Sequence, residues 1–511
     1  MRILKRGNSN KMATDVGISD QGAFDTSGIG GQPAGLSTLF FTEMWERFSY
    51  YGMRALLVLF LTATVQNGGF GLNDATATAI YGLYTASVYL VGLPGGWIAD
   101  RILGHRRSVF IGGMFIAAGH FSMALGWVAT FYLGLALIVI GTGLLKPNVS
   151  AIVGDLYPEG GARRDAGFSI FYMGINLGAF IGPLICGYLG EKVNWHLGFA
   201  AAGVGMVFGL IQYRLGYKRL GTGGLRDLKA SEKAAASRIL LAVLGVAALG
   251  VAALVLLNLN GTIALSPLGV AKSLGFVIPA LTLSYFGYQI IFGGFDSVEK
   301  KRIGVIFVLF IAAAMFWAGY EQAGSSMNLF AERLTDRVVL GWEMPTTWLQ
   351  SVNPLLVIGF APVFGFLWLR LGDRQPSIPA KFALGLIQLG VGFAVLAWAS
   401  VYVGDPANPN KVSAGWLVAT YFFHTMGELC LSPVGLSAMT KLSPAKLVGQ
   451  MMGIWFMATS FGNLMAGLLA GKMESLGLVQ LFGSVALWVG AAGLLLLVIS
   501  RPVKRLMGGV Q

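Results

Sequence analysis

The chain has 511 residues, of which 55% are hydrophobic and only 12% are charged, and its mean hydropathy is +0.69. Because soluble domains carry about 25% charged residues, this composition excludes an ordinary soluble protein and indicates an integral membrane protein. The formal net charge is +13, but most Lys and Arg residues lie in short loops between apolar segments. That distribution is typical of membrane proteins and argues against nucleic-acid binding.

The first 35 residues are polar and rich in glycine, and no short apolar stretch precedes a cleavage site in them. We expect residues 1–35 to form a disordered cytoplasmic tail rather than a signal peptide. Apolar runs of about 20 residues then recur, each long enough to cross about 30 Å of hydrocarbon. The sequence predicts fourteen membrane-spanning helices, at residues 38–65, 76–101, 107–128, 130–153, 165–189, 197–217, 237–258, 270–294, 302–325, 346–370, 379–402, 413–438, 446–471 and 478–500.

The first span carries four charged residues, although each charge costs about 2.5–3.5 kcal/mol at the centre of a membrane helix. On a helical wheel these charges share an arc of about 140° with two tyrosines. The members of this stripe are Glu43, Glu46, Arg47, Tyr50, Tyr51 and Arg54. The stripe must face other helices or a water-filled cavity. Ion pairs that only fix the helix register, such as Glu43 with Arg47, are the alternative.

The charge of the loops predicts the orientation. Every loop that follows an even-numbered span is basic, beginning with Arg101, Arg106 and Arg107 after the second span. The opposite loops are poorer in basic residues. Since basic loops stay on the cytoplasmic side, we expect both termini in the cytoplasm.

Polar residues also interrupt later spans. They are Lys146, Asn176, Glu321, Asn353 and Glu428. Such groups are costly in hydrocarbon and mark functional sites, so together with the stripe of the first span they predict the lining of a cavity.

The fifth span has glycine at every fourth position, Gly174, Gly178 and Gly182. Small residues let membrane helices approach closely, so we expect this face to pack against a neighbouring helix. Asn176 points roughly the opposite way, consistent with a place in the cavity.

The seventh and eighth spans contain few polar residues except near their ends, which suggests an inserted hairpin between two groups of six spans. Six plus six helices around a central site is the layout of the major facilitator superfamily, an all-α membrane fold. The predicted parts are the tail at 1–35, an N-terminal six-helix bundle at 36–220, a linker with the inserted hairpin at 221–300, and a C-terminal six-helix bundle at 301–505.

The loop GGWIADRILGHRRS (Gly95–Ser108) resembles the signature that this superfamily carries after its second span. The resemblance implies that Asp100 and the arginines Arg101, Arg106 and Arg107 latch cytoplasmic helix ends together. A weaker copy, GFLWLRLGDR (Gly365–Arg374), occupies the corresponding place in the second half.

A more specific resemblance begins in the first span, where EMWERFSYYG (Glu43–Gly52) matches the ExxERFxYYG signature of the proton-dependent oligopeptide transporter family. Four further stretches resemble that family: GTGLLKPNVS (Gly141–Ser150), FSIFYMGINLGAFIGP (Phe168–Pro183), FWAGYEQAGSS (Phe316–Ser326) and GELCLSPVGLS (Gly427–Ser437). The resemblance covers residues 36–505 and includes the hairpin typical of bacterial members. It implies import of di- and tripeptides, driven by protons, across the inner membrane of a bacterium. It implies no metal and no cofactor besides the coupling proton, and a monomer.

Peptides of different sequence share a terminal carboxylate, a terminal ammonium and backbone amides, so a transporter that accepts many of them should bind these groups. Arg54 and Lys146 suit the carboxylate, and Glu428 suits the ammonium. Asn176 and Asn353 can donate to and accept from the peptide backbone. The resemblance gives these residues similar roles. An alternative for Asn353, which precedes a proline, is that it only caps a helix kink.

Aromatic side chains could form the walls that accept the peptide's own side chains, because they are apolar with polar tips. The resemblance favours Tyr50, Tyr51, Tyr89, Trp317 and Trp455. For Tyr89 and Trp455, ordinary packing between helices is the alternative.

Proton coupling requires an acid whose affinity for the proton changes as its neighbours change. The resemblance favours Glu43, Glu46, Arg47, Lys146 and Glu321 for this role. Our hypothesis is that protonation of Glu321 frees Arg54 for the peptide, while Glu43 and Glu46 exchange partners with Lys146.

Histidine is a weak candidate for the proton carrier. None of the four histidines falls in the second span, where animal relatives carry a functional one. His424, four residues before Glu428, is the one marginal candidate.

Other functions fit the residues less well. A proton-coupled carrier for another small zwitterion or anion, such as an amino acid or nitrate, is the main alternative, although charges of both signs favour a zwitterion. The sequence has neither an H-E-x-x-H zinc motif nor a G-x-x-x-x-G-K-[ST] loop, which argues against a metalloenzyme and against ATP-driven transport.

Overall fold

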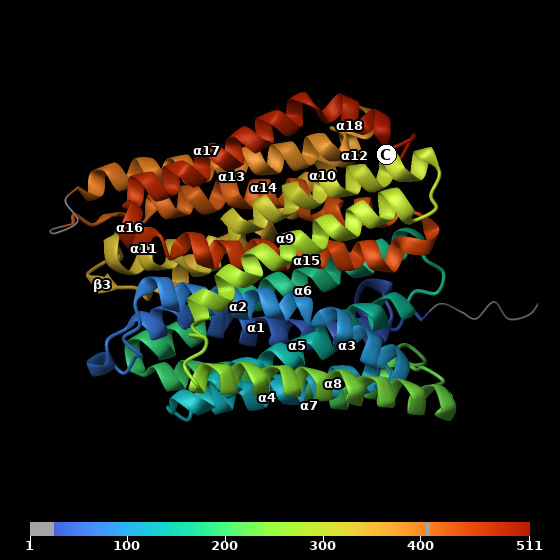
Figure 1. Cartoon of the computed structure of the whole chain (residues 1–511), viewed down its shortest axis with the longest axis horizontal. Coiled ribbons are helices and arrows are strands. Elements are labelled where there is room, and N and C mark those ends of the chain that lie inside the picture. Colours follow the sequence, from blue (N-terminus) through green and yellow to red (C-terminus); the bar gives the residue numbers. More distant parts are fainter. Residues whose placement is uncertain (1–24, 405–408, 511) are drawn as a thin grey trace, which may run out of the picture.

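The computed structural model of the chain describes residues 25–404 and 409–510. It is built almost entirely of long helices that run side by side along the long axis of the molecule (Figure 1). Most of the predicted tail, residues 1–35, lies outside the described residues. The described residues 25–33 lie against the bundle, where Tyr157 Oη donates a hydrogen bond of 2.8 Å to Gln32 Oε1 and Arg163 Nη2 donates one of 3.0 Å to the Gly31 carbonyl.

The first group of helices, called here the N-terminal half, occupies the lower part of Figure 1. Its helices are α1 (Ala34–Thr62), α2 (Asp74–Leu90), α3 (Gly92–Ile98), α4 (His105–Met123), α5 (Val128–Asp155), α6 (Gly161–Tyr188) and α7 (Trp195–Leu215). α2, α3 and the turn η3 (Ala99–Leu103) together form one span. α1 packs against α6 and α7, and α4 packs against α5, so α1 lies inside this half.

The second group, the C-terminal half, occupies the upper part of Figure 1. Its helices are α10 (Ser297–Tyr320), α11 (Ser326–Leu334), α12 (Val352–Leu371), α13 (Ile378–Val403), α14 (Gly415–Leu442), α15 (Val448–Ala470), α16 (Met473–Leu476), α17 (Leu478–Val498) and α18 (Ser500–Leu506). Two short turns, η6 (Glu321–Gly324) and η7 (Thr346–Ser351), interrupt the helical path before α11 and α12. Four two-residue strands pair as β1 (Thr335–Asp336) with β4 (Val412–Ser413), in parallel, and β2 (Val338–Val339) with β3 (Trp342–Glu343), antiparallel.

Two helices connect the halves, α8 (Ala230–Leu259) and α9 (Pro267–Phe292). α9 contacts α2 of the N-terminal half as well as α10 and α15 of the C-terminal half. α8 contacts η3, and its most apolar stretch is exposed throughout. A 30-residue apolar helix with this exposure is suited to lipid. α8 therefore lies at the periphery, whereas α9 packs against helices of both halves. That the pair is an insertion between two six-helix bundles stays a prediction.

Each of the fourteen predicted spans overlaps a helix. Within the described ranges, eleven helical segments are long and apolar enough to cross a membrane. α1, α4 and α14 are the other three predicted spans, with 29, 19 and 28 residues. The predicted all-α membrane fold is confirmed.

The bundle has two ends, which we name by one residue each. The Asp100 end carries the start of α1, η3 and the C-terminus, at the right of Figure 1. The Asp74 end carries the start of α2, α11 and the short strand β3, at the left of the same view.

The glycine stripe of α6 packs on α1, as predicted. A Cβ added to Gly178 would collide with the backbone carbonyl of Met44, and one added to Gly182 would meet the backbone of Phe48. The two helices therefore approach at backbone contact, and this close approach fixes where the charged stripe of α1 lies relative to Asn176 on α6.

The segment Gly95–Ser108 was expected to be a loop, and the structure differs here. The chain stays helical through η3 to Leu103, and α4 begins at His105. Gly104 alone separates them, with φ 77°, a conformation that favours glycine because it has no Cβ. The reversal between these spans therefore takes one residue.

Candidate functional site

A cavity of about 110 Å³ lies between the two halves. It is lined by Tyr51, Arg54, Tyr89, Tyr172, Ile175, Asn176, Ala179, Pro183, Trp317, Tyr320, Glu321, Ala323, Gln350, Asn353, Pro354, Tyr421, His424 and Glu428. These residues come from α1, α2 and α6 on one side and from α10, η6, η7, α12 and α14 on the other. A ligand held here would therefore contact both halves at once.

Arg54 and Glu321 cross the boundary between the halves. Arg54 Nη1 lies 2.9 Å from Glu321 Oε2, and the two side chains are only 6% and 3% exposed. The guanidinium also lies 5.1 Å from the ring centroid of Tyr51 and 6.0 Å from that of Tyr81. A buried arginine between a carboxylate and two aromatic rings is held by charge and by cation–π attraction.

Glu321 takes its position from a break in the helix. α10 ends at Tyr320, and Glu321 is the first residue of the turn η6. Tyr81 Oη of the N-terminal half donates a hydrogen bond of 3.4 Å to the Glu321 backbone carbonyl. The span predicted as one helix over 302–325 is thus interrupted at Glu321, the carboxylate predicted to take part in proton coupling.

The remaining charges of the α1 stripe pair locally. Arg47 Nε lies 2.8 Å from Glu43 Oε1 and 2.7 Å from Glu46 Oε2, and all three side chains are buried. The second nitrogen of the fork, Arg47 Nη2, and Glu43 Oε2 have no hydrogen-bond partner among the described residues. The ion pair expected under the alternative, Glu43 with Arg47, therefore forms in this conformation. The cluster also keeps this nitrogen and this carboxylate oxygen available for other partners.

Lys146 on α5 lies beside the cavity, with Nζ 4.1 Å from the ring centroid of Tyr89. It is close enough to Glu43, Glu46 and Arg47 to interact with their charges. Tyr89 lines the cavity and Lys146 does not, so the Tyr89 ring is the part of the lining that Lys146 contacts. Tyr89 thus contacts both the cavity and a cation, and its role in peptide binding stays a prediction.

Glu428 on α14 is the carboxylate on the opposite wall. Tyr320 Oη donates a hydrogen bond of 2.5 Å to Glu428 Oε2, and Asn353 Nδ2 donates one of 3.2 Å to the same oxygen. Asn353 also donates a 2.9 Å bond to Thr425 Oγ1. Its amide therefore does more than cap a kink before Pro354. Both hydrogen bonds come from neutral groups, which leaves the carboxylate available to a cation.

Eight of the predicted peptide-binding and proton-coupling residues line the cavity: Tyr51, Arg54, Tyr89, Asn176, Trp317, Glu321, Asn353 and Glu428. Tyr50 packs beside Tyr51, with ring centroids 5.2 Å apart. Trp455 packs on Gly435 and lies 6.3 Å from the Phe382 ring centroid. For Trp455 this geometry favours the packing alternative.

The lining also contains polar residues that were not predicted. They are Tyr172, Tyr320, Gln350 and Tyr421. Helical spacing could have found two of them, because Tyr172 precedes Asn176 by four residues and Tyr421 precedes Glu428 by seven. His424, a marginal candidate for proton transfer, stands on the same face of α14 and lines the cavity.

The four residues of the predicted latch at the Asp100 end differ in their contacts. Arg106 Nε and Nη2 donate hydrogen bonds of 2.6 Å to the carbonyls of Gly223 and Gly221, so this arginine ties the start of α4 to the segment after α7. Asp100 Oδ1 lies 3.4 Å from His105 Nε2. Arg101 and Arg107 are exposed. Arg106 thus joins α4 to the segment after α7, and Asp100 of η3 contacts the first residue of α4.

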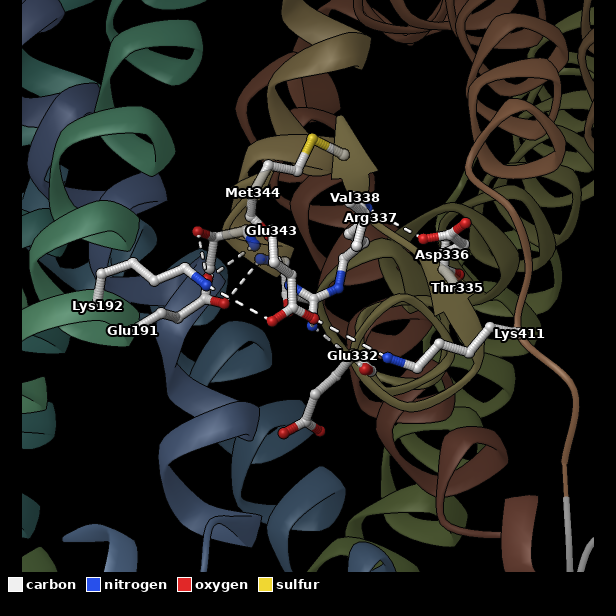
Figure 2. A network of polar contacts seen from close by, with 12 residues as sticks. Glu191, Lys192, Glu332, Thr335, Asp336, Arg337, Val338, Glu343, Met344 and Lys411 are labelled. Carbon is white, nitrogen blue, oxygen red and sulfur yellow. Dashed lines mark hydrogen bonds and ion pairs between the residues drawn. The ribbon is translucent and has the colours of Figure 1, made fainter. Parts of the chain in front are cut away.

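The Asp74 end joins the halves by a polar network (Figure 2). Glu191, in the turn after α6, accepts hydrogen bonds from the Thr346 and Thr347 backbone N–H groups (2.7 and 2.9 Å) and from Thr347 Oγ1 (2.7 Å). Beside it, Lys192 Nζ lies 3.8 Å from Glu343 Oε2. Figure 2 shows Glu191 and Lys192 facing Glu343 across the junction.

A second contact at this end is an ion pair. Arg333 Nη1 and Nη2 donate hydrogen bonds of 2.7 and 2.8 Å to the two carboxylate oxygens of Asp74. Asn328 Nδ2 donates a 2.8 Å bond to the Ala55 carbonyl. Because each bond links the C-terminal half to the N-terminal half, the halves are held together at the Asp74 end.

The arrangement can bind a small molecule that carries both charges. Arg54 is a cationic group on one wall, Glu428 an anionic group on another, and Asn176 and Asn353 offer amides between aromatic residues. Within the described ranges, no group of three His, Cys, Asp or Glu side chains is placed to hold a metal ion.

Comparison with known proteins agrees with this geometry. The model of the POT family matches residues 106–480. The peptide transporter YePEPT of Yersinia enterocolitica subsp. palearctica serotype O:3 (strain YE-P4) is 43% identical over 500 residues, which cover 94% of this chain and 96% of that protein. The di-/tripeptide transporter of Lactococcus lactis subsp. cremoris is 38% identical over 492 residues, which cover 94% and 98%.

Two solved structures are also similar. The crystal structure of a peptide transporter POT in complex with sulfate superposes with a TM-score of 0.87 at 43% identity, covering 94% of this chain and 97% of that one. The crystal structure of a POT family transporter in complex with 5-aminolevulinic acid gives a TM-score of 0.86 at 34% identity, covering 94% and 99%. The resemblance that began with the ExxERFxYYG stretch thus extends over nearly the whole chain, and the chain belongs to the POT family.

Proposed function

We propose that the protein is a symporter that imports di- and tripeptides together with protons across the inner membrane of a bacterium. The observation that carries the proposal is the presence of Arg54 and Glu428 in the lining of one cavity, since a peptide zwitterion needs a cation for its carboxylate and an anion for its ammonium. The names of the related transporters support the same substrate class.

The basic loops support an orientation with the Asp100 end in the cytoplasm. In that orientation, Glu191 and the Asp74–Arg333 pair close the outer side of the cavity. The transporting parts would be the six-helix bundles at 36–220 and 301–505, with 221–300 as a peripheral hairpin. The cavity lies between the two halves of a single chain, and one chain is the transporting unit that we propose.

The Arg54–Glu321 pair gives a route from proton to peptide. In the present conformation Glu321 occupies the guanidinium that would bind the peptide carboxylate. A proton on Glu321 removes its negative charge and with it the Coulomb attraction between the carboxylate and the guanidinium. Arg54 is then free to bind the peptide carboxylate. When Glu321 loses its proton again, its carboxylate displaces the peptide from Arg54.

A second acidic group, Glu43 and Glu46 with Arg47, would respond to the same cycle. Lys146 is near both glutamates and near the cavity through Tyr89. When a peptide carboxylate draws Lys146 toward the cavity, the balance of charge around the two glutamates changes, and proton exchange follows.

The driving force is sufficient. A membrane potential of about 100 mV contributes about 2.3 kcal/mol for each positive charge, and each pH unit adds about 1.4 kcal/mol. Together they sustain a gradient of several hundred-fold for a neutral dipeptide, since about 1.4 kcal/mol corresponds to a factor of ten.

Reconstitution into liposomes tests the proposal. With the interior made alkaline and negative, labelled dialanine should accumulate above its external concentration, and an uncoupler should stop accumulation. Excess unlabelled dialanine should compete, while free alanine and nitrate should not. Competition by alanine or nitrate instead would favour the alternative, a carrier for another small zwitterion or anion.

A further inference from the structure

His424 is the one histidine of the cavity lining, and its polar atoms are not used by the mechanism above. It is 1% exposed, and within the described residues no side chain pairs with either ring nitrogen; the one polar group given as interacting with the ring is the backbone of Leu389 on α13. A buried polar atom without a partner is costly unless water or a ligand supplies one. The position of the ring in the cavity wall makes a ligand the available partner.

The packing of the ring defines which nitrogen can reach a ligand. A Cβ added to Gly392 on α13 would meet Cδ2 and Nε2 of His424, and the ring also lies near the backbone of Leu389 on the same helix. Phe393, again on α13, is 4.8 Å away between ring centroids. Nδ1 is the corner of the imidazole opposite the Cδ2–Nε2 edge. It is therefore the ring nitrogen farther from Gly392, and it is the one that we assign to a ligand.

Burial without a partner does not by itself mark a site. His120 on α4 is 0% exposed, and both of its ring nitrogens also lack partners within the described ranges. His120 is not among the cavity-lining residues, whereas His424 is. This difference makes His120 a matched reference for the cost of an unpaired buried imidazole.

We propose that His424 is a specificity-determining residue, whose Nδ1 accepts a hydrogen bond from a hydroxyl donor on the first side chain of a bound peptide. The proposal rests on the function proposed above, in which Glu428 binds the peptide ammonium. His424 precedes Glu428 by four residues, so it stands about 6 Å along α14 on the same face. In a bound peptide, the first side chain is attached to the carbon that carries the ammonium, so it can reach His424 from a position beside Glu428. The second side chain is farther from His424. Tyr320, 6.5 Å from the His424 ring centroid, flanks the same space.

Isosteric peptides test this inference in the unaltered protein. Thr-Ala and Val-Ala have nearly the same shape and differ by a hydroxyl at the first position, and Ala-Thr and Ala-Val differ in the same way at the second. The Thr/Val ratio of kcat/KM for uptake should be about five-fold higher at the first position than at the second, as expected for one net hydrogen bond. Equal ratios at the two positions would overturn the inference, whereas failure to transport any of the four peptides would overturn the proposed function.

Variants locate the effect. His424→Phe keeps a ring but removes both nitrogens, and it should bring the first-position ratio down to that of the second position. His424→Asn keeps a polar atom near Nδ1 and should restore part of the ratio. The matched control His120→Phe should leave both ratios unchanged. A His424→Phe protein that folds, transports dialanine and keeps the full first-position preference would also overturn the inference.

Discussion

Arg54 of α1 and Glu321 of η6, which both line the cavity, are joined by a 2.9 Å ion pair that links the two halves. Glu321→Gln removes the negative charge permanently and mimics the protonated state. We expect this variant to lose proton-driven accumulation of dialanine, because no proton can be taken up or released at that position. Exchange of labelled for unlabelled peptide at equal concentrations needs no net proton movement and should continue.

Counterflow and gradient-driven uptake in the same liposomes measure the two activities separately. The control is Glu474→Gln, a glutamate in α16 that is exposed to solvent, which should behave as the unaltered protein in both assays. Loss of both activities in Glu321→Gln would contradict the coupling role and make the carboxylate a structural partner of Arg54.

Glu428 receives hydrogen bonds from Tyr320 and Asn353 but no cation among the described residues. Glu428→Gln keeps the shape and removes the charge, so the peptide ammonium loses a charge-assisted hydrogen bond of about 1.5–3 kcal/mol. We expect KM for dialanine to rise about 10- to 100-fold, since about 1.4 kcal/mol corresponds to a factor of ten.

A peptide without the ammonium provides the specific readout. The unaltered protein should discriminate strongly against N-acetyl-dialanine, and Glu428→Gln should discriminate much less. Glu428→Asp retains the charge and should retain most of the discrimination. Unchanged discrimination in Glu428→Gln would place the ammonium elsewhere in the cavity.

The helices could be predicted because each follows from a local property, an apolar run long enough to cross the membrane. The face of α1 was also predictable, since the helical period alone places Arg54 and Glu43 on one side. The break at Glu321 was not predicted, although Gly319 directly precedes the end of α10 at Tyr320, because glycine is also frequent inside membrane helices and does not by itself mark an end. A partner from the other half also meets the chain at this point, since Tyr81 Oη donates a hydrogen bond to the Glu321 carbonyl, and the sequence alone does not reveal that contact.

Partners distant in the chain were likewise beyond prediction. Glu191 and Thr346 lie 155 residues apart, and only the packing of the two halves brings them together. Tyr320 was not predicted for a related reason. Its hydroxyl binds Glu428, which lies on another helix, and the sequence does not show that this helix is a neighbour.

Closure at the Asp74 end depends on Glu191, which accepts three hydrogen bonds from Thr346 and Thr347 across the junction. Glu191→Ala leaves two backbone N–H groups at the start of η7 without this acceptor. Since removal of a helix cap costs about 1 kcal/mol or more, the equilibrium should shift several-fold toward a state open at this end. Spin labels on the exposed residues Gln66 and Leu340 should report more long distances between the halves.

Lys192→Ala is the control for this measurement, because its 3.8 Å contact with Glu343 is partly exposed and should contribute little. A distance distribution that is the same in Glu191→Ala and in the unaltered protein would mean that the Asp74–Arg333 pair and the apolar contacts hold the junction without Glu191.

The contact between α1 and α6 leaves no room for a side chain at Gly178, where an added Cβ would strike the Met44 carbonyl and lie 2.9 Å from Arg47 Cβ. Gly178→Ala should therefore separate the two helices and disturb the Glu43–Arg47 pair. We expect a loss of stability of about 1–3 kcal/mol, as for overpacking in a well-packed core, and lower uptake of peptide. Thermal unfolding in detergent measures the first effect and liposome uptake the second.

Gly359→Ala on α12 is the control, because nothing lies within 4 Å of the added Cβ, and it should leave both stability and uptake unchanged. A Gly178→Ala protein with unaltered melting and uptake would show that α1 and α6 can slide apart at no cost, and the close packing would then not be what positions the charged stripe beside the cavity.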